Sequence, residues 1–259
     1  MNAPQPRDAW RVAALTMMRP EELRALLGGD DAAVWVEAAA ACGMPEAQLR
    51  LGRLLLEGKG VAKDERAAFA CFLCAAECGD IDAQNMLGRC YENGWGAAQD
   101  FARASECYRV AAEAGYDWAQ YNLGHLLLDG TGIARDREQA FNWYMRAASQ
   151  GHVRAMNLVA RCFEEGWGVE RALAAARNWY RKSAEGGYFR GAYNYATLLA
   201  ADGCITGAQM WFQRALAAAP EPTRMNMRRA LARQPNPGSM GRPPRAKSDQ
   251  VEAYPAFLK

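Results

Sequence analysis

The chain of 259 residues is poor in the residue types and motifs that enzymes and metalloproteins rely on. It has two histidines, His125 and His152, and it contains no GxSxG, Walker, HExxH or paired CxxC motif. A hydrolase needs a nucleophile, a base and an orienting group held together, and the sequence offers no such set. We therefore expect no catalytic residues, no bound metal and no cofactor.

Long apolar runs and a dominant charge are also missing. No stretch of about 18 apolar residues occurs, and the first residues show no basic segment followed by an apolar core, as a secretory signal would. The formal net charge is +2, and the basic excess is confined to residues 220–259, so the rest of the chain lacks the basic stripe of a nucleic-acid-binding protein. We predict a cytoplasmic protein with no membrane span and no nucleic-acid partner. A periplasmic or exported protein is the alternative.

What the sequence has in abundance is repetition. A phrase that begins at Ala47 returns every 36 residues, at Ala83, Ala119 and Ala155, and Gly191 holds the same place in a fifth, shortened copy. A fixed period in the range of about 20–50 residues indicates a solenoid, in which stacked repeats bury a shared core. Solenoids usually bind other molecules, so this period favours a binding function over catalysis.

Each repeat is predicted to form two helices joined by a glycine turn. In the third copy, apolar residues recur at helical spacing from Ala119 to Leu128, and Gly130 then ends the first helix, where a left-handed residue costs least when it is glycine. Asp136 suits the N-cap of the second helix, because its carboxylate can accept from the exposed amides. Ala172 stands at this place in the fourth copy and predicts a weaker helix start.

The repeats also define the domain boundaries that we expect in an all-α fold. Residues 1–30 are predicted to be an N-terminal helical cap, 31–218 the solenoid, 219–234 a C-terminal capping helix and 235–259 a disordered, basic, proline-rich tail. The expected parts of the solenoid are a half-repeat and five repeats: 31–46, 47–82, 83–118, 119–154, 155–190 and the shortened 191–218.

The repeated phrase A-x-x-x-L-G-x-L-Y-x-x-G-x-G-V-x-x-D-x-x-x-A-x-x-W-Y-x-x-A-A-x-x-G resembles that of the Sel-one-like repeat (SLR) family, a branch of the tetratricopeptide superfamily. The resemblance covers about residues 31–218. It implies a right-handed α/α solenoid of helix pairs whose first helices line a concave groove. It also implies a non-enzymatic adaptor for a protein or peptide partner, in signalling, regulation or complex assembly. We expect the chain itself to be a monomer.

Three positions of each first helix are predicted to face solvent and line this groove, namely one before, two after and six after the leading alanine. In the superfamily, asparagine with a basic residue one turn later can clamp a peptide carboxylate, and Asn85 with Arg89 matches that pairing in type. Such a groove would suit acidic residues or a free C-terminal carboxylate. The expected groove residues are Asn85, Arg89, Trp118, Tyr121, His125, Arg154, Asn157, Arg161, Arg190 and Tyr193.

Two alternatives to peptide binding by this groove stay open. Arg89 and Arg161 each precede a glutamate by three residues, so these arginines are also suited to solvated ion pairs within their own helices. A regulator that binds a small ligand in the groove is the other alternative, and a deep closed pocket would distinguish it from an open peptide site.

The eight cysteines and the repeated tryptophans are interpreted as packing residues. Six cysteines fall at three shared repeat positions, and leucine or tryptophan fills two of these positions in other copies. A metal or redox site at Cys71, Cys74 and Cys78 is the alternative, but neither histidines nor a second CxxC accompany them. The C-x7-C spacing by which some secreted relatives cross-link their helix pairs is absent. The residues assigned to the core by their repeat position are Trp143, Trp179 and Trp211.

Overall fold

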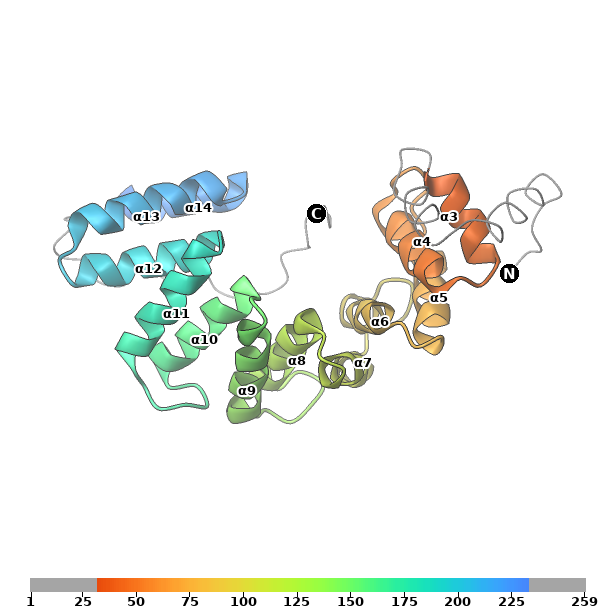
Figure 1. Cartoon of the computed structure of the whole chain (residues 1–259), viewed down its shortest axis with the longest axis horizontal. Coiled ribbons are helices and arrows are strands. Elements are labelled where there is room, and N and C mark those ends of the chain that lie inside the picture. The colour runs from red at the N-terminus through yellow and green to blue at the C-terminus, as the bar shows by residue number, and fades with distance from the viewer. Residues whose placement is uncertain (1–31, 233–259) are drawn as a thin grey trace. The chain divides into compact units, whose positions relative to one another are not determined.

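The structure, a computed structural model, describes residues 32–232, which form twelve α-helices and no strand (Figure 1). The predicted all-α class of helix-turn-helix repeats is thereby confirmed. The N-terminal cap predicted for residues 1–30 and the tail predicted for residues 235–259 lie outside the described residues. The chain divides into two compact units, Met1–Arg135 and Asp136–Lys259.

The described part of unit 1 contains six helices in which neighbours along the chain pack on one another. First helices of the repeats are α4, α6 and α8, and second helices are α5 and α7, with α3 in the half-repeat. Their bounds are α3 Ala32–Ala41, α4 Pro45–Glu57, α5 Glu65–Glu77, α6 Ile81–Asn93, α7 Phe101–Glu113 and α8 Asp117–Asp129.

The described part of unit 2 also contains six helices. Here α10 and α12 are first helices, and α9, α11 and α13 are second helices. Each first helix packs between two second helices, α10 between α9 and α11, and α12 between α11 and α13. Their bounds are α9 Arg137–Ser149, α10 Val153–Glu165, α11 Leu173–Glu185, α12 Phe189–Ala201, α13 Ile205–Ala218 and α14 Glu221–Ala232.

The helix ends follow the predicted signals. Gly130 ends α8 in the left-handed region, with φ of 74°. The Asp136 side chain caps α9 by accepting from the backbone N–H of Gln139 at 2.9 Å, and these backbone and side-chain contacts with Gln139 lower the pKa of the Asp136 carboxyl. No side chain caps α11 at Ala172, as the sequence predicts.

The second glycine of three paired-glycine loops, at Gly96, Gly132 and Gly168, packs against the second helix of the repeat before it. Gly96 has φ of 72°, and a Cβ placed on it would lie 2.1 Å from the backbone oxygen of Glu65. The same contact recurs in unit 2, where a Cβ on Gly168 would lie 2.0 Å from the backbone oxygen of Arg137. Only glycine permits both this conformation and this approach, so the loop is a packing element.

A large ring on each second helix fills the core beside a small residue on the first helix. Tyr108 and Tyr180 are fully buried. A Cβ on Gly88 would lie 2.6 Å from the Tyr108 ring, which explains the glycine at this place, and the same place in unit 2 holds Ala160, which packs with Tyr180. The core interpretation of the tryptophans holds for Trp143 and Trp211, each 9% exposed, and Trp179 is half-buried.

Candidate functional site

We call the three predicted groove positions of each first helix the first-helix face. The position two after the leading alanine is not exposed, contrary to the prediction, because Asn85 and Asn157 are buried. The next first helix of the same unit covers this position. Asn122 Nδ2 donates to Asn85 Oδ1 at 3.0 Å, and Asn194 Nδ2 donates to Asn157 Oδ1 at 2.9 Å. Helical periodicity within one helix could not foresee this cover.

The arginines six after the leading alanine lie over tryptophan rings of the glycine loops. The Arg89 guanidinium is 5.1 Å from the centre of the Trp95 ring and approaches the sulfur of Met86 at 3.5 Å, so that Arg89 is only 6% exposed. Arg161 is half-buried at 4.9 Å from the Trp167 ring. Stacking of this kind is favourable and holds the flat guanidinium in one orientation.

The glutamates that were candidate ion-pair partners accept hydrogen bonds from tyrosines of the second helices. Tyr108 donates to Glu92 at 2.5 Å, and Tyr180 donates to Glu164 at 2.8 Å. Burial raises the pKa of Glu92, and the Tyr108 hydroxyl and Arg89 offset that rise only in part. A tyrosine–glutamate hydrogen bond therefore accompanies both Arg89 and Arg161.

The position one before the leading alanine differs in charge between the units. In unit 1, Asp82 accepts from Arg53 at 2.5 Å and from the Tyr116 hydroxyl at 3.0 Å. The negative charge of Asp82 is therefore paired with a residue of the same unit. In unit 2, the equivalent Arg154 lies 5.8 Å from the Tyr188 ring, and Arg190 lies 5.7 Å from the Phe189 ring.

The aromatic members of the first-helix face pack on one another. On α8, the Tyr121 ring lies edge-on to Trp118 at 6.2 Å and to His125 at 4.6 Å between centroids, and only 9% of Tyr121 is exposed. Tyr193 on α12 is half-buried, at 5.2 Å from the Phe212 ring, and burial raises the pKa of its hydroxyl. The structure thus brings Trp118, Tyr121 and His125 together as one aromatic group.

His152 has a structural role that the sequence analysis missed. Its Nδ1 accepts from the backbone N–H of Ala155 at 3.1 Å and caps the start of α10. The signal was available, because aspartate caps α6 at the same place, with Asp80 accepting from Ala83 at 2.8 Å. An accepting Nδ1 carries no proton, so the cap requires neutral His152 in this geometry.

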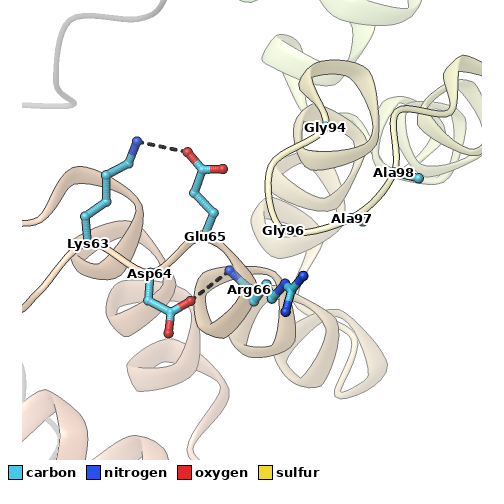
Figure 2. Close-up of a pocket in the computed structure, with 8 residues that line it drawn as sticks. All are labelled: Lys63, Asp64, Glu65, Arg66, Gly94, Gly96, Ala97 and Ala98. Atoms are coloured by element: carbon cyan, nitrogen blue, oxygen red, sulfur yellow. Dashed lines mark hydrogen bonds and ion pairs between the residues drawn. The ribbon is translucent and has the colours of Figure 1, made fainter.

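Two adjoining cavities of unit 1 lie at a glycine loop and away from the first-helix face. One holds about 600 Å³ and is lined by residues 63–66 and by the loop from Gly94 to Ala98 (Figure 2). The other holds about 340 Å³, beside Tyr91 and Arg103. Figure 2 shows that Lys63 of the first cavity pairs with Glu65 at 2.9 Å and that Asp64 accepts from the backbone N–H of Arg66 and so caps α5. Sequence analysis had no signal for these cavities, because their residues are typical of a repeat turn.

The cysteines are all free thiols. Cys90 and Cys162 are buried at equivalent places, and burial raises the pKa of each thiol to about 12. Within residues 32–232, no group of three or more histidine, cysteine or acidic side chains is arranged to hold a metal ion, and this includes Cys71, Cys74 and Cys78. Of the helices in the same range, none combines the length and the apolar character needed to cross a membrane.

Tandem helix pairs, glycine loops and first helices that cover one another define an α/α-solenoid repeat protein. The chain belongs to the Sel1 repeat family, whose model matches residues 45–80, 81–116, 119–152 and 153–188. The predicted resemblance to this family is therefore confirmed. Sel1 repeat proteins generally mediate protein–protein interactions and are generally non-enzymatic scaffolds.

Two bacterial proteins of solved structure share the fold of this chain. The chain is 27% identical to a Sel1 repeat protein from Oxalobacter formigenes, with a TM-score of 0.68 over 79% of this chain and 87% of that one. It is 26% identical to a protective antigen with an SLR fold present in uropathogenic Escherichia coli strains, with a TM-score of 0.69 over 87% of this chain and 49% of the antigen. It thus spans about half of that antigen. No curated protein matches the chain.

Proposed function

We propose that the chain is a non-enzymatic adaptor whose first-helix face binds a segment of another protein in each of its two units. The observation that carries the proposal is that an arginine of a first helix lies over a tryptophan ring in both units, and buried asparagine pairs hold the first helices of each unit together beside it. An asparagine pair bridges consecutive first helices at Asn85 and Asn122 in unit 1 and at Asn157 and Asn194 in unit 2. An arginine stacked on a tryptophan follows one turn after the first asparagine in both units.

The chemistry of this face favours a partner segment with acidic residues or a free C-terminal carboxylate. The N–H groups of a guanidinium lie in its own plane, so a guanidinium that lies over a ring can still donate two parallel hydrogen bonds to a carboxylate at its edge. Unit 2 carries three such arginines, Arg154, Arg161 and Arg190, each over an aromatic ring. We therefore propose that unit 2 contributes most of the affinity for acidic groups.

The test compares partner capture by wild type and by the variant Arg154→Gln/Arg190→Gln. Both arginines are half-buried at the face, whereas Arg89 is only 6% exposed, so a substitution there would also disturb packing. The matched control is Arg137→Gln/Arg228→Gln, which removes the same charge from two exposed arginines elsewhere in unit 2. Proteins that co-purify from cells of the source organism are quantified by mass spectrometry, and circular dichroism checks the fold.

A partner lost from the face variant and retained by the control would support the adaptor proposal. Equal partner recovery from all three forms would refute a role for the face in unit 2. If no protein is captured and small-molecule addition raises the melting temperature of wild type but not of the face variant, the small-ligand alternative replaces it. We also propose a cytoplasmic, monomeric protein, which cell fractionation and sedimentation would test.

A further inference from the structure

The second helices of unit 2 carry a regular feature that the first-helix face does not use. Each of α9, α11 and α13 places a cation over the ring of the tryptophan three residues before it. We call these three pairs the tryptophan–cation row. The distances from the cationic group to the ring centroid are 4.5 Å for Arg146 on Trp143, 4.3 Å for Lys182 on Trp179 and 4.7 Å for Arg214 on Trp211.

The three cations are exposed and available for a partner. Arg146, Lys182 and Arg214 all lie at the surface, and within residues 32–232 they make no ion pair. Neighbouring arginines of α11 are different, because Arg177 is bound to Asp202 and Arg181 lies 4.0 Å from Glu185. The row therefore keeps its charge while other cations of the same helix are neutralised.

The row is confined to unit 2. Two repeats earlier, the positions of Trp143 and Arg146 hold Cys71 and Cys74. The positions of Trp179 and Lys182 hold Cys107 and Val110, of which the valine is 51% exposed. The equivalent helices of unit 1 therefore pack without a tryptophan or a cation at these positions, so the fold does not require the row.

We propose that the tryptophan–cation row is a second interaction surface, which binds an acidic segment of a partner protein. Each tryptophan holds its cation in place, which lowers the entropy lost when a carboxylate binds. Equivalent helices repeat the pair at regular intervals, so one acidic segment that crosses α9, α11 and α13 can meet all three cations. This proposal does not depend on the first-helix face.

Nucleic acid and membrane fit the row less well than an acidic protein segment. The acidic residues Glu138 on α9 and Glu185 on α11 lie exposed on the same helices, so flexible carboxylate side chains, which can turn toward the cations, fit the row better than phosphates held at fixed, close spacing. The indole rings of Trp143 and Trp211 are 9% exposed and covered by their cations, so they cannot reach into a bilayer interface as anchoring tryptophans do.

The experiment measures binding of a fluorescein-labelled oligoglutamate peptide to the full chain by fluorescence anisotropy at low salt. The row variant is Arg146→Gln/Lys182→Gln/Arg214→Gln. The matched control, Arg66→Gln/Arg137→Gln/Arg228→Gln, removes the same charge from three exposed arginines that are also without ion pairs within the described residues. The Lys182→Arg variant tests whether a conservative cation preserves binding. A labelled oligothymidylate is the nucleic-acid comparison.

We expect the row variant to bind oligoglutamate about tenfold more weakly than wild type, as three exposed ion pairs imply. The control and Lys182→Arg should stay within about twofold of wild type. Equal loss in the row variant and the control would overturn the proposal, because bulk charge would then explain binding. Tighter binding of oligothymidylate than of oligoglutamate would overturn the choice of partner. No binding of oligoglutamate by the folded wild type would overturn it as well.

Discussion

Unit 1 and unit 2 carry the same interior and different surfaces. Positions 72 residues apart hold identical residues at the asparagine pairs, as in Asn85 and Asn157, and a buried ring at the core position of the second helices, as in Tyr108 and Tyr180. Several exposed or half-exposed positions at the same spacing differ in charge or in type, as Asp82 and Arg154 do. The packing of the repeat thus leaves little freedom, whereas the surface of each unit is free to acquire its own binding chemistry.

The largest expected effect comes from the glycine that joins consecutive repeats. Gly96→Ala forces a left-handed backbone onto alanine and places its Cβ 2.1 Å from a backbone oxygen, so we expect a loss of roughly 2–5 kcal/mol of stability. Gly168→Ala should cost the same in unit 2. Urea denaturation with thiol labelling distinguishes the units, because buried Cys90 reports on unit 1 and buried Cys162 on unit 2.

Gly115→Ala is the control for this prediction. Gly115 also has a positive φ, of 96°, but a Cβ on it would meet nothing within 4 Å. Its cost should be limited to the backbone term, roughly 1–2 kcal/mol. If Gly96→Ala costs no more than Gly115→Ala, the loop contact does not hold consecutive repeats together.

The asparagine pairs should contribute alike in the two units. Asn85→Ala leaves the Asn122 amide without its buried acceptor and should cost about 1–3 kcal/mol, and Asn157→Ala should do the same for Asn194. The double variant Asn85→Leu/Asn122→Leu removes both polar groups and should cost less than Asn85→Ala. Urea denaturation measures all three variants against wild type. A double variant worse than the single one would mean that the pair itself supplies net stability.

The second helices of the two units differ in their N-terminal caps, and a substitution can remove this difference. The Asp100 side chain caps α7 by accepting from the backbone N–H of Arg103 at 3.0 Å, whereas no side chain caps α11 in unit 2. Asp100→Ala should cost about 1 kcal/mol, and Ala172→Asp should add about 1 kcal/mol. Thermal unfolding followed by circular dichroism gives both values. Ala172→Asn, which caps without charge, separates the hydrogen bond from the attraction of a carboxylate to the helix dipole.

The smallest expected effect is a change in pH dependence in unit 1. Burial raises the pKa of Glu92, so the stability tied to its protonated form is present below the unfolded pKa of about 4.5 and is lost as pH rises through the folded pKa. Glu92→Gln keeps an acceptor for Tyr108 and removes this loss. The variant should match wild type near pH 4 and exceed it slightly near pH 7 in urea midpoints. A variant that is less stable near pH 7 would show that the attraction to Arg89 outweighs burial.

Repeat geometry made most of the fold predictable from the sequence. Two repeat positions specify the turn and the cap locally. Glycine ends the first helix, as Gly130 does, and aspartate caps the start of the second helix, as Asp136 does. The burial of Asn85 was not predictable in the same way, because the cover comes from Asn122 of the next repeat. Helical periodicity treats each helix alone, whereas contacts between repeats decide exposure here.

The candidate site was predictable in its residue types and less so in its geometry. The basic and aromatic positions of the first helices could be read from the repeat, but their ring partners could not, since Trp95 and Trp167 belong to the glycine loops. The row on the second helices escaped prediction for a related reason. A tryptophan in a core column indicates packing, and only the structure shows that Arg146 lies on its outer side.

Residues at the position of the asparagine pairs alternate in the sequence between apolar and polar types from one repeat to the next. Where α4 meets α6, the equivalent positions hold Leu49 and Met86 in one apolar cluster, and the next interface in unit 1 holds an asparagine pair. Deleting one 36-residue repeat would set an asparagine against an apolar side chain, whereas deleting two would restore matched neighbours. The smallest module that can be copied or removed without a polar mismatch is therefore a pair of repeats, and shortened or lengthened versions of this chain should be viable in steps of 72 residues.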